Sequence, residues 1–196
     1  MVGTASRYLY WLPEDDPGCE QLDLRFGDQG VRALGLVLRG RKGAHVRCRY
    51  ELEADAAWNF RRLTISATGD GPEAPQRRDI SRSPEGGWQV DGEAAPELEG
   101  CSEVDIQVTP FTNSLPIRRL KLGKGESAEL RVAYLPVPAL TPVAVAQRYT
   151  CLEPLGESGG RYLYEGLFRG FRAELPVDPD GLVTDYPETF RRQWPR

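Results

Sequence analysis

The sequence has a single histidine and no paired cysteines, and these shortages count against several kinds of site. His45 stands alone among 196 residues, so the usual zinc and non-haem iron ligand sets, which combine histidines, are missing. It also falls on the polar phase of a strand-like segment with no visible partner, which disfavours its use as a general base. Cys19, Cys48, Cys101 and Cys151 form no CxxC pair. We therefore predict no metal site, no cofactor and no catalytic residue.

Phosphate-binding loops and a strong positive charge are also missing. The chain contains neither GxxxxGK[ST] nor GxGxxG after a strand, and it has no GxSxG nucleophile elbow. Its 25 basic residues are spread among 29 acidic ones, which gives a net charge of −4. A basic stripe is the electrostatic footprint of nucleic-acid binding, and its absence predicts that nucleic acid is not a partner.

No hydrophobic run is long enough to span a bilayer. The longest, residues 135–146, holds three prolines and is shorter than the approximately 20 apolar residues that a transmembrane helix needs. The N-terminus shows no cleavable apolar leader, because Met1–Trp11 is already strand-like. We expect a cytoplasmic protein with reduced thiols and no transmembrane segment.

Period-two alternation of apolar and polar residues recurs along the chain. It is clear in the segments 21–26, 45–52, 61–67 and 102–109, and glycine-rich turn signals such as GDQG and TGDG separate such segments. This alternation indicates strands with one buried face, and the spacing of the turns favours antiparallel hairpins. The sequence predicts one mainly β, largely antiparallel domain over residues 1–196.

One stretch, TPFTNSLPIRRLKL at 109–122, breaks the alternation. Thr112 or Asn113 is a good N-cap, and Pro116 is tolerated in a first helical turn, where its missing N–H has no partner. Gly123 is a natural stop. The stretch therefore predicts a helix at about 113–122, the only convincing one in the chain.

Other features leave alternatives open. Arg118 and Arg119 either pair with strand acids such as Asp105 or hold an anionic group of a ligand. The strand aromatics either pack the core or line an apolar cavity. Asp178–Gly181 resembles part of a calcium loop, but the downstream ligands are missing, and turn formation explains the same letters.

Four segments together resemble a known family. They are GGWQVDGE at 86–93, LEGCSEVDIQVTPFTNSLPIRRL at 98–120, AQRYTCL at 146–152 and VDPDGLVTDYPETFRR at 177–192. Their pattern is similar to that of the bacterial "putative glycolipid-binding" family, over at least Trp58 to Arg192. The resemblance implies a spiral β-roll, in which a many-stranded sheet wraps a single helix, and it implies a homodimer. It also implies a shape like that of periplasmic carriers that hold acyl chains, with no catalytic residues to transfer.

The leading hypothesis is a binding protein that encloses a glycolipid or another amphipathic small molecule between sheet and helix. Five polar or charged side chains are the candidates for ligand contacts at the mouth of this pocket: Asn113, Arg118, Arg119, Gln147 and Tyr149.

Two alternatives remain from the residues alone. One is an enzyme that acts on a sugar or lipid with a carboxylate pair drawn from Asp91, Glu103 and Asp105. The other is a structural dimeric partner protein, in which the arginines make internal salt bridges and the surplus apolar surface forms the subunit interface.

Overall fold

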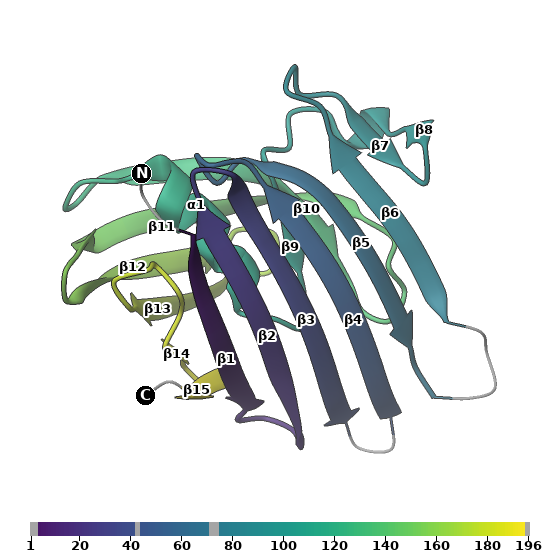
Figure 1. Cartoon of the computed structure of the whole chain (residues 1–196), viewed down its shortest axis with the longest axis horizontal. Coiled ribbons are helices and arrows are strands. Elements are labelled where there is room, and N and C mark those ends of the chain that lie inside the picture. Colours follow the sequence, from purple (N-terminus) through teal and green to yellow (C-terminus); the bar gives the residue numbers. More distant parts are fainter. Residues whose placement is uncertain (1–3, 42–43, 71–74, 195–196) are drawn as a thin grey trace.

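Two β-sheets make up most of the molecule (Figure 1). The computed structural model describes residues 4–41, 44–70 and 75–194. The larger sheet has ten strands in the order β14-β15-β1-β2-β3-β4-β5-β6-β7-β8, all paired antiparallel. Their bounds are β1 Ala5–Pro13, β2 Gly18–Gly27, β3 Gly30–Arg41, β4 Ala44–Ala54, β5 Phe60–Thr68, β6 Gln76–Arg82, β7 Trp88–Val90, β8 Glu93–Ala94, β14 Asp185–Tyr186 and β15 Phe190–Trp194.

The smaller sheet has five strands in the order β13-β12-β11-β10-β9. Their bounds are β9 Glu103–Ile106, β10 Ser127–Leu135, β11 Val143–Gly156, β12 Gly159–Gly166 and β13 Phe171–Val177. Its pairs are antiparallel except for β9 and β10, which run parallel. An isolated bridge between Val177 and Val183 connects the edge of this sheet to the segment that leads into β14.

The alternation seen in the sequence matches the buried face of each strand. On β2, Leu22 and Leu24 are fully buried while the residues between and beside them face outward or lie partly exposed. The same holds for Leu63 and Ile65 on β5. Because successive side chains of a strand point to opposite faces, these apolar residues all face one shared core.

A short helical segment lies in this core between the two sheets. A 3₁₀ turn, η2 (Phe111–Asn113), runs directly into α1 (Ser114–Leu120), and a separate 3₁₀ turn, η1 (Pro96–Leu98), precedes β9. Leu115 and Ile117 of α1 are buried among residues from both sheets. The prediction of a mainly β, largely antiparallel fold around one helix is confirmed, although the strands form two sheets.

The predicted helix bounds and caps need correction. Asn113 has helical backbone angles, because η2 leads straight into α1, so its side chain makes no N-cap bond. Thr109 takes that role instead, since its Oγ1 accepts a hydrogen bond from the backbone N–H of Phe111 at 3.0 Å. At the other end Lys121 adopts the left-handed conformation that terminates the helix, two residues before Gly123.

The Asp178–Gly181 segment forms a turn, which is one of the two interpretations of its sequence, the other being part of a calcium loop. The Asp178 Oδ1 atom accepts hydrogen bonds from the backbone N–H groups of Asp180 and Leu182, each at 3.0 Å. Its Oδ2 atom pairs with Arg192. Both oxygens of this carboxylate thus serve the turn and its attachment to β15.

In the described part of the chain, none of the helices is long and apolar enough to cross a membrane. A cytoplasmic location stays a prediction. All four cysteines are free, and three of them, Cys48, Cys101 and Cys151, are buried.

Candidate functional site

Residues 109–120 are held in place by carboxylates that point inward from both sheets. Glu20 on β2 is completely buried. Its Oε1 atom accepts hydrogen bonds from the hydroxyls of Thr109 and Tyr50, both at 2.6 Å. Glu20 therefore ties the ten-stranded sheet to the start of the helical segment.

Gly35 on β3 makes this contact possible. It lies opposite Tyr50 in the β3–β4 register, and a Cβ atom at Gly35 would come within 2.1 Å of the Tyr50 ring. The ring therefore occupies the space that any larger residue would fill. This packing directs the Tyr50 hydroxyl toward Glu20.

The second carboxylate, Asp105 on β9, accepts one hydrogen bond at each oxygen. Thr112 donates to Oδ1 at 3.0 Å, and the Gln147 side-chain amide donates to Oδ2 at 2.6 Å. Burial raises the pKa of Asp105, and the two donors only partly oppose this rise. Gln147 itself is buried on β11.

The third carboxylate, Glu103 on β9, pairs with Arg119 of α1. Burial raises the pKa of Glu103 to about 7 despite the charge of Arg119. Arg118 instead lies over aromatic rings, with its guanidinium carbon 5.0 Å from the Trp58 centroid and 5.9 Å from that of Phe26. Arg119 thus pairs with a strand acid, as one interpretation of the sequence expects, but the acid is Glu103 rather than Asp105.

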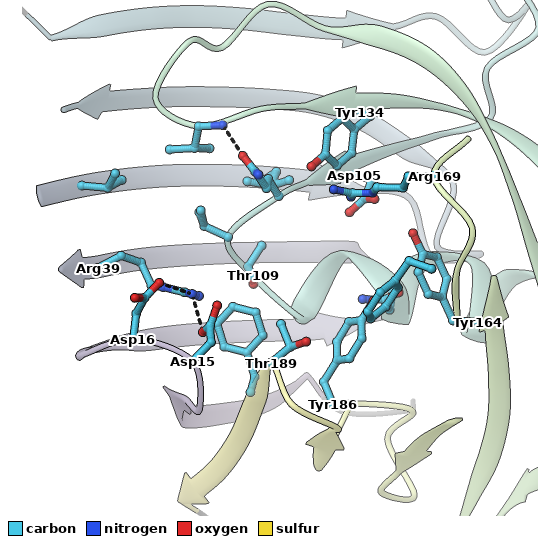
Figure 2. Close-up of a pocket in the computed structure, with 18 residues that line it drawn as sticks. Asp15, Asp16, Arg39, Asp105, Thr109, Tyr134, Tyr164, Arg169, Tyr186 and Thr189 are labelled. Atoms are coloured by element: carbon cyan, nitrogen blue, oxygen red, sulfur yellow. Dashed lines mark hydrogen bonds and ion pairs between the residues drawn. The ribbon is translucent and has the colours of Figure 1, made fainter. Parts of the chain in front are cut away.

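A pocket of about 280 Å³ opens between the two sheets beside η2 (Figure 2). Side chains from both sheets and from the segment before α1 surround it: Asp15, Asp16, Arg39, Val46, Asp105, Ile106, Gln107, Val108, Thr109, Asn113, Tyr134, Val137, Tyr164, Arg169, Phe171, Tyr186, Thr189 and Phe190. Five of these residues are aromatic and nine are polar or charged, so the lining combines apolar surface with polar groups.

The charged groups of the pocket lie in two separate places (Figure 2). On one side Arg39 forms salt bridges with Asp15 at 2.7 Å and Asp16 at 3.5 Å. On the other side Arg169 lies beside Asp105 and Tyr134. The first cation is thus already engaged by two carboxylates.

Three tyrosines lie on the Arg169 side. Burial raises the pKa values of Tyr134, Tyr164 and Tyr186 above that of a free tyrosine. Their hydroxyls therefore remain protonated at neutral pH and can donate hydrogen bonds. These tyrosines consequently offer hydrogen-bond donors and aromatic surface to the pocket.

Of the five predicted ligand-binding residues, Asn113 lines the pocket. Its Oδ1 atom accepts a hydrogen bond from the Tyr149 hydroxyl at 2.8 Å, and Gln147 holds Asp105. Tyr149 and Gln147 thus hold the lining residues Asn113 and Asp105 in place without lining the pocket themselves. Arg118 and Arg119 contact the protein groups given above, outside the pocket lining. Ligand contact by any of the five stays a prediction.

Sequence reasoning missed Arg169 and the aromatic pairing of Tyr164 with Tyr186. The rings of these tyrosines lie 6.2 Å apart, although β12 and β14 belong to different sheets. The available signals were the DYP motif at 185–187 and the arginine in the LFRG turn at 167–170. Neither indicates by itself that the two segments meet.

The acids considered for an enzyme do not gather in the pocket. Asp105 lines it, Glu103 pairs with Arg119, and Asp91 lies in the turn between β7 and β8, near Arg78. Among the described residues, no group of three histidine, cysteine or acidic side chains could hold a metal ion.

Replacement of Glu20 by glutamine should weaken the pH dependence of stability. Burial raises the pKa of Glu20 from 4.5 to about 7, with Thr109, Tyr50 and Arg39 opposing the rise. The folded protein therefore binds more protons than the unfolded chain between these pH values, and its unfolding free energy falls as pH rises through this window. The decline from this one group is on the order of 3 kcal/mol.

Glu20→Gln keeps an oxygen acceptor for both hydroxyls but removes the ionisation. Urea unfolding at about pH 5 and about pH 8 should show a smaller decline in the variant than in the wild type, by a difference on the order of 3 kcal/mol. The Glu103 contribution is present in both proteins and cancels in this comparison. An equal decline in the two proteins would contradict the assignment.

Comparison with known proteins shows which family this chain matches. The model of the family described as "Putative glycolipid-binding" matches residues 8–192. A crystal structure of a DUF1089 family protein from Pseudomonas aeruginosa is 37% identical, with a TM-score of 0.74 over 88% of this chain and 91% of that one.

A second solved structure shares the fold alone. It is a β-barrel-like protein of the DUF1849 domain family from Brucella abortus, 13% identical, with a TM-score of 0.55 over 97% of this chain and 94% of that one. No curated protein matches the chain. Since the family model covers nearly the whole sequence, the chain belongs to the "putative glycolipid-binding" family.

Proposed function

We propose that this protein is a binding protein for an amphipathic, lipid-like molecule, of the glycolipid kind that the family description names. The pocket between the two sheets is the observation that carries this proposal. Its aromatic side chains suit an apolar ligand segment, and its polar groups suit a head group.

The aromatic surface comes from both sheets. Tyr164 and Phe171 of the five-stranded sheet meet Tyr186 of the ten-stranded sheet, with ring centroids 6.2 and 6.0 Å apart. A ligand placed here would contact both sheets at once. This supports a site for a molecule with an apolar portion.

The volume limits how much of a lipid can enter. About 280 Å³ is near the lower end of the range of roughly 300–1,000 Å³ for small-molecule sites. An enclosed segment of about six methylenes would contribute about 5 kcal/mol, which corresponds to millimolar affinity or little better. Tight binding therefore requires recognition of the head group by the polar side chains.

Filling the pocket should abolish ligand binding. Thr189 lies in the lining between β14 and β15 and is partly exposed, so Thr189→Trp should occupy the pocket without disturbing the core. Native mass spectrometry would follow complexes with dodecyl β-glucoside, dodecanoate, dodecyl phosphate and dodecyltrimethylammonium. We expect a one-to-one complex of the wild type with at least one of them and none with the variant.

Thr141→Trp is the matched control, because Thr141 is exposed in the connection between β10 and β11 and does not line the pocket. It should bind as the wild type does. If the wild type binds none of the four amphiphiles, or if Thr189→Trp binds them unchanged, the proposed function is wrong.

We also propose a homodimer that forms through an outer apolar patch. Six large apolar side chains, each at least 40% exposed, lie on the outer face of β15, β1 and β3: Tyr8, Tyr10, Leu12, Leu34, Leu38 and Trp194. Asp23 on β2 lies opposite Tyr8 of β1 on one side and opposite Leu34 of β3 on the other. Its buried Oδ1 atom has no hydrogen-bond partner among the described residues. A group of large exposed apolar side chains on one face is typical of subunit interfaces.

The mass in solution tests this interface. Light scattering after size exclusion should give a dimer for the wild type and a monomer for Leu34→Glu, since a charge within the patch opposes its burial. Leu167→Glu, at a comparably exposed leucine outside the patch, should remain a dimer. A monomeric wild type would refute the proposal.

A further inference from the structure

We propose that the pocket binds the oxyanion head of an acidic amphiphile, a phosphate or a carboxylate, through the Arg169 guanidinium and the Tyr134 hydroxyl. This inference rests on the proposed function and adds the chemistry of the ligand's head group. It concerns the side of the pocket where Arg169, Tyr134 and Tyr164 lie together (Figure 2).

The Tyr134 hydroxyl is a buried polar group whose proton has no acceptor among the described residues. The residue is only 7% exposed, it lines the pocket, and its oxygen makes no hydrogen bond of normal geometry with the described residues. The Arg169 guanidinium lies against the Tyr134 ring, and its charge and hydrogen bonding oppose the rise of the Tyr134 pKa. Because a guanidinium only donates, it can satisfy the hydroxyl oxygen but leaves the O–H without an acceptor. Buried hydroxyls in native proteins almost always have a partner, and a ligand atom in the pocket would supply it.

Arg169 is a cation held in place without a carboxylate. It lies in the turn between β12 and β13, with its guanidinium carbon 4.8 Å from the Tyr134 ring centroid and 4.5 Å from that of Phe168. No salt bridge joins it to another residue in the described ranges 4–41, 44–70 and 75–194. A guanidinium only donates hydrogen bonds, and its planar fork matches carboxylate and phosphate oxygens.

The remaining polar groups on this side leave a surplus of donors. Tyr164 and Tyr186 also line the pocket with protonated hydroxyls. Asp105 is the carboxylate here, and each of its oxygens already accepts a hydrogen bond, from Thr112 and from Gln147. A ligand that supplies acceptors would therefore satisfy these donors. A neutral sugar presents donors and acceptors together, whereas an oxyanion presents acceptors alone.

One of the two cations of the lining is not paired with a carboxylate of the described residues. Arg39, the other cation of the lining, is engaged by Asp15 and Asp16 across the pocket, which leaves Arg169 as the cation available to a ligand among the described lining residues. The negative charge of Asp105 opposes an anion, but both oxygens of this carboxylate are engaged by hydrogen bonds from Thr112 and Gln147.

Calorimetric titration with four amphiphiles of equal chain length tests the inference. The probes are dodecanoate, dodecyl phosphate, dodecyl β-glucoside and dodecyltrimethylammonium, each below its micelle concentration. We expect the wild type to bind at least one of the two acids about tenfold more tightly than the glucoside, because charge-assisted hydrogen bonds are stronger than neutral ones. The difference between the carboxylate and the phosphate probe identifies which oxyanion fits.

Two variants assign the preference to its residues. Arg169→Gln and Tyr134→Phe should each reduce the preference for the acid to about threefold or less. Arg172→Gln, at an exposed arginine on β13 outside the lining, should keep it. Because Arg169 is exposed, its replacement leaves the core intact, and Tyr134→Phe keeps the ring.

The outcomes separate this inference from the proposed function. Glucoside binding equal to or tighter than that of both acids, or an acid preference that survives Arg169→Gln, overturns the oxyanion site and leaves the binding function standing. Binding of none of the four probes to the wild type overturns both.

Discussion

The carboxylates of Glu20, Asp105 and Glu103 point inward from two different sheets, and one short segment of chain donates a hydrogen bond to each of them. Thr109 donates to Glu20, Thr112 donates to Asp105, and Arg119 pairs with Glu103. A buried carboxylate without a donor is costly, so the segment must pass close to β2 and β9 at the same time. This requirement fixes residues 109–120 between the sheets more specifically than apolar packing alone, because hydrogen bonds are directional.

The pocket follows from the same arrangement. The helical segment occupies part of the space between the sheets. The pocket opens beside this segment, and Asp105 and Asn113 line it there. Gln147 and Tyr149 hold these two residues from the five-stranded sheet. The site and the core thus share side chains, and the head-group side of the pocket is built on the contacts that position the helix.

Much of the fold could be predicted from the sequence because it depends on local pattern. Alternation along 21–26 and 61–67 reports a buried face directly, since each strand must cover the core with every second residue. The helix at 113–122 was predicted nearly correctly for the same reason. Its caps were not, because the hydroxyl that serves the N-terminus belongs to Thr109, before a 3₁₀ turn that the pattern does not reveal.

The candidate site was harder to predict because it is formed by contacts between distant segments. The pairing of Arg119 with Glu103 instead of Asp105 depends on which carboxylate of β9 lies beside α1. The pocket depends on the meeting of β12 with β14, about twenty residues apart in sequence and in different sheets. The family resemblance predicted the general shape of the fold. The contact between Arg169 and Tyr134 is visible only in the three-dimensional structure.

A double-mutant cycle on Arg119 and Glu103 measures how strongly a buried carboxylate of the sheets holds the helical segment. Near pH 8 the single change Arg119→Met should lower the unfolding free energy by about 3–5 kcal/mol, because it leaves Glu103 buried and unpaired. The double variant Arg119→Met/Glu103→Leu should lose less unfolding free energy than the two single variants lose together, by about 2 kcal/mol or more. Losses that add to within about 0.5 kcal/mol would contradict the account.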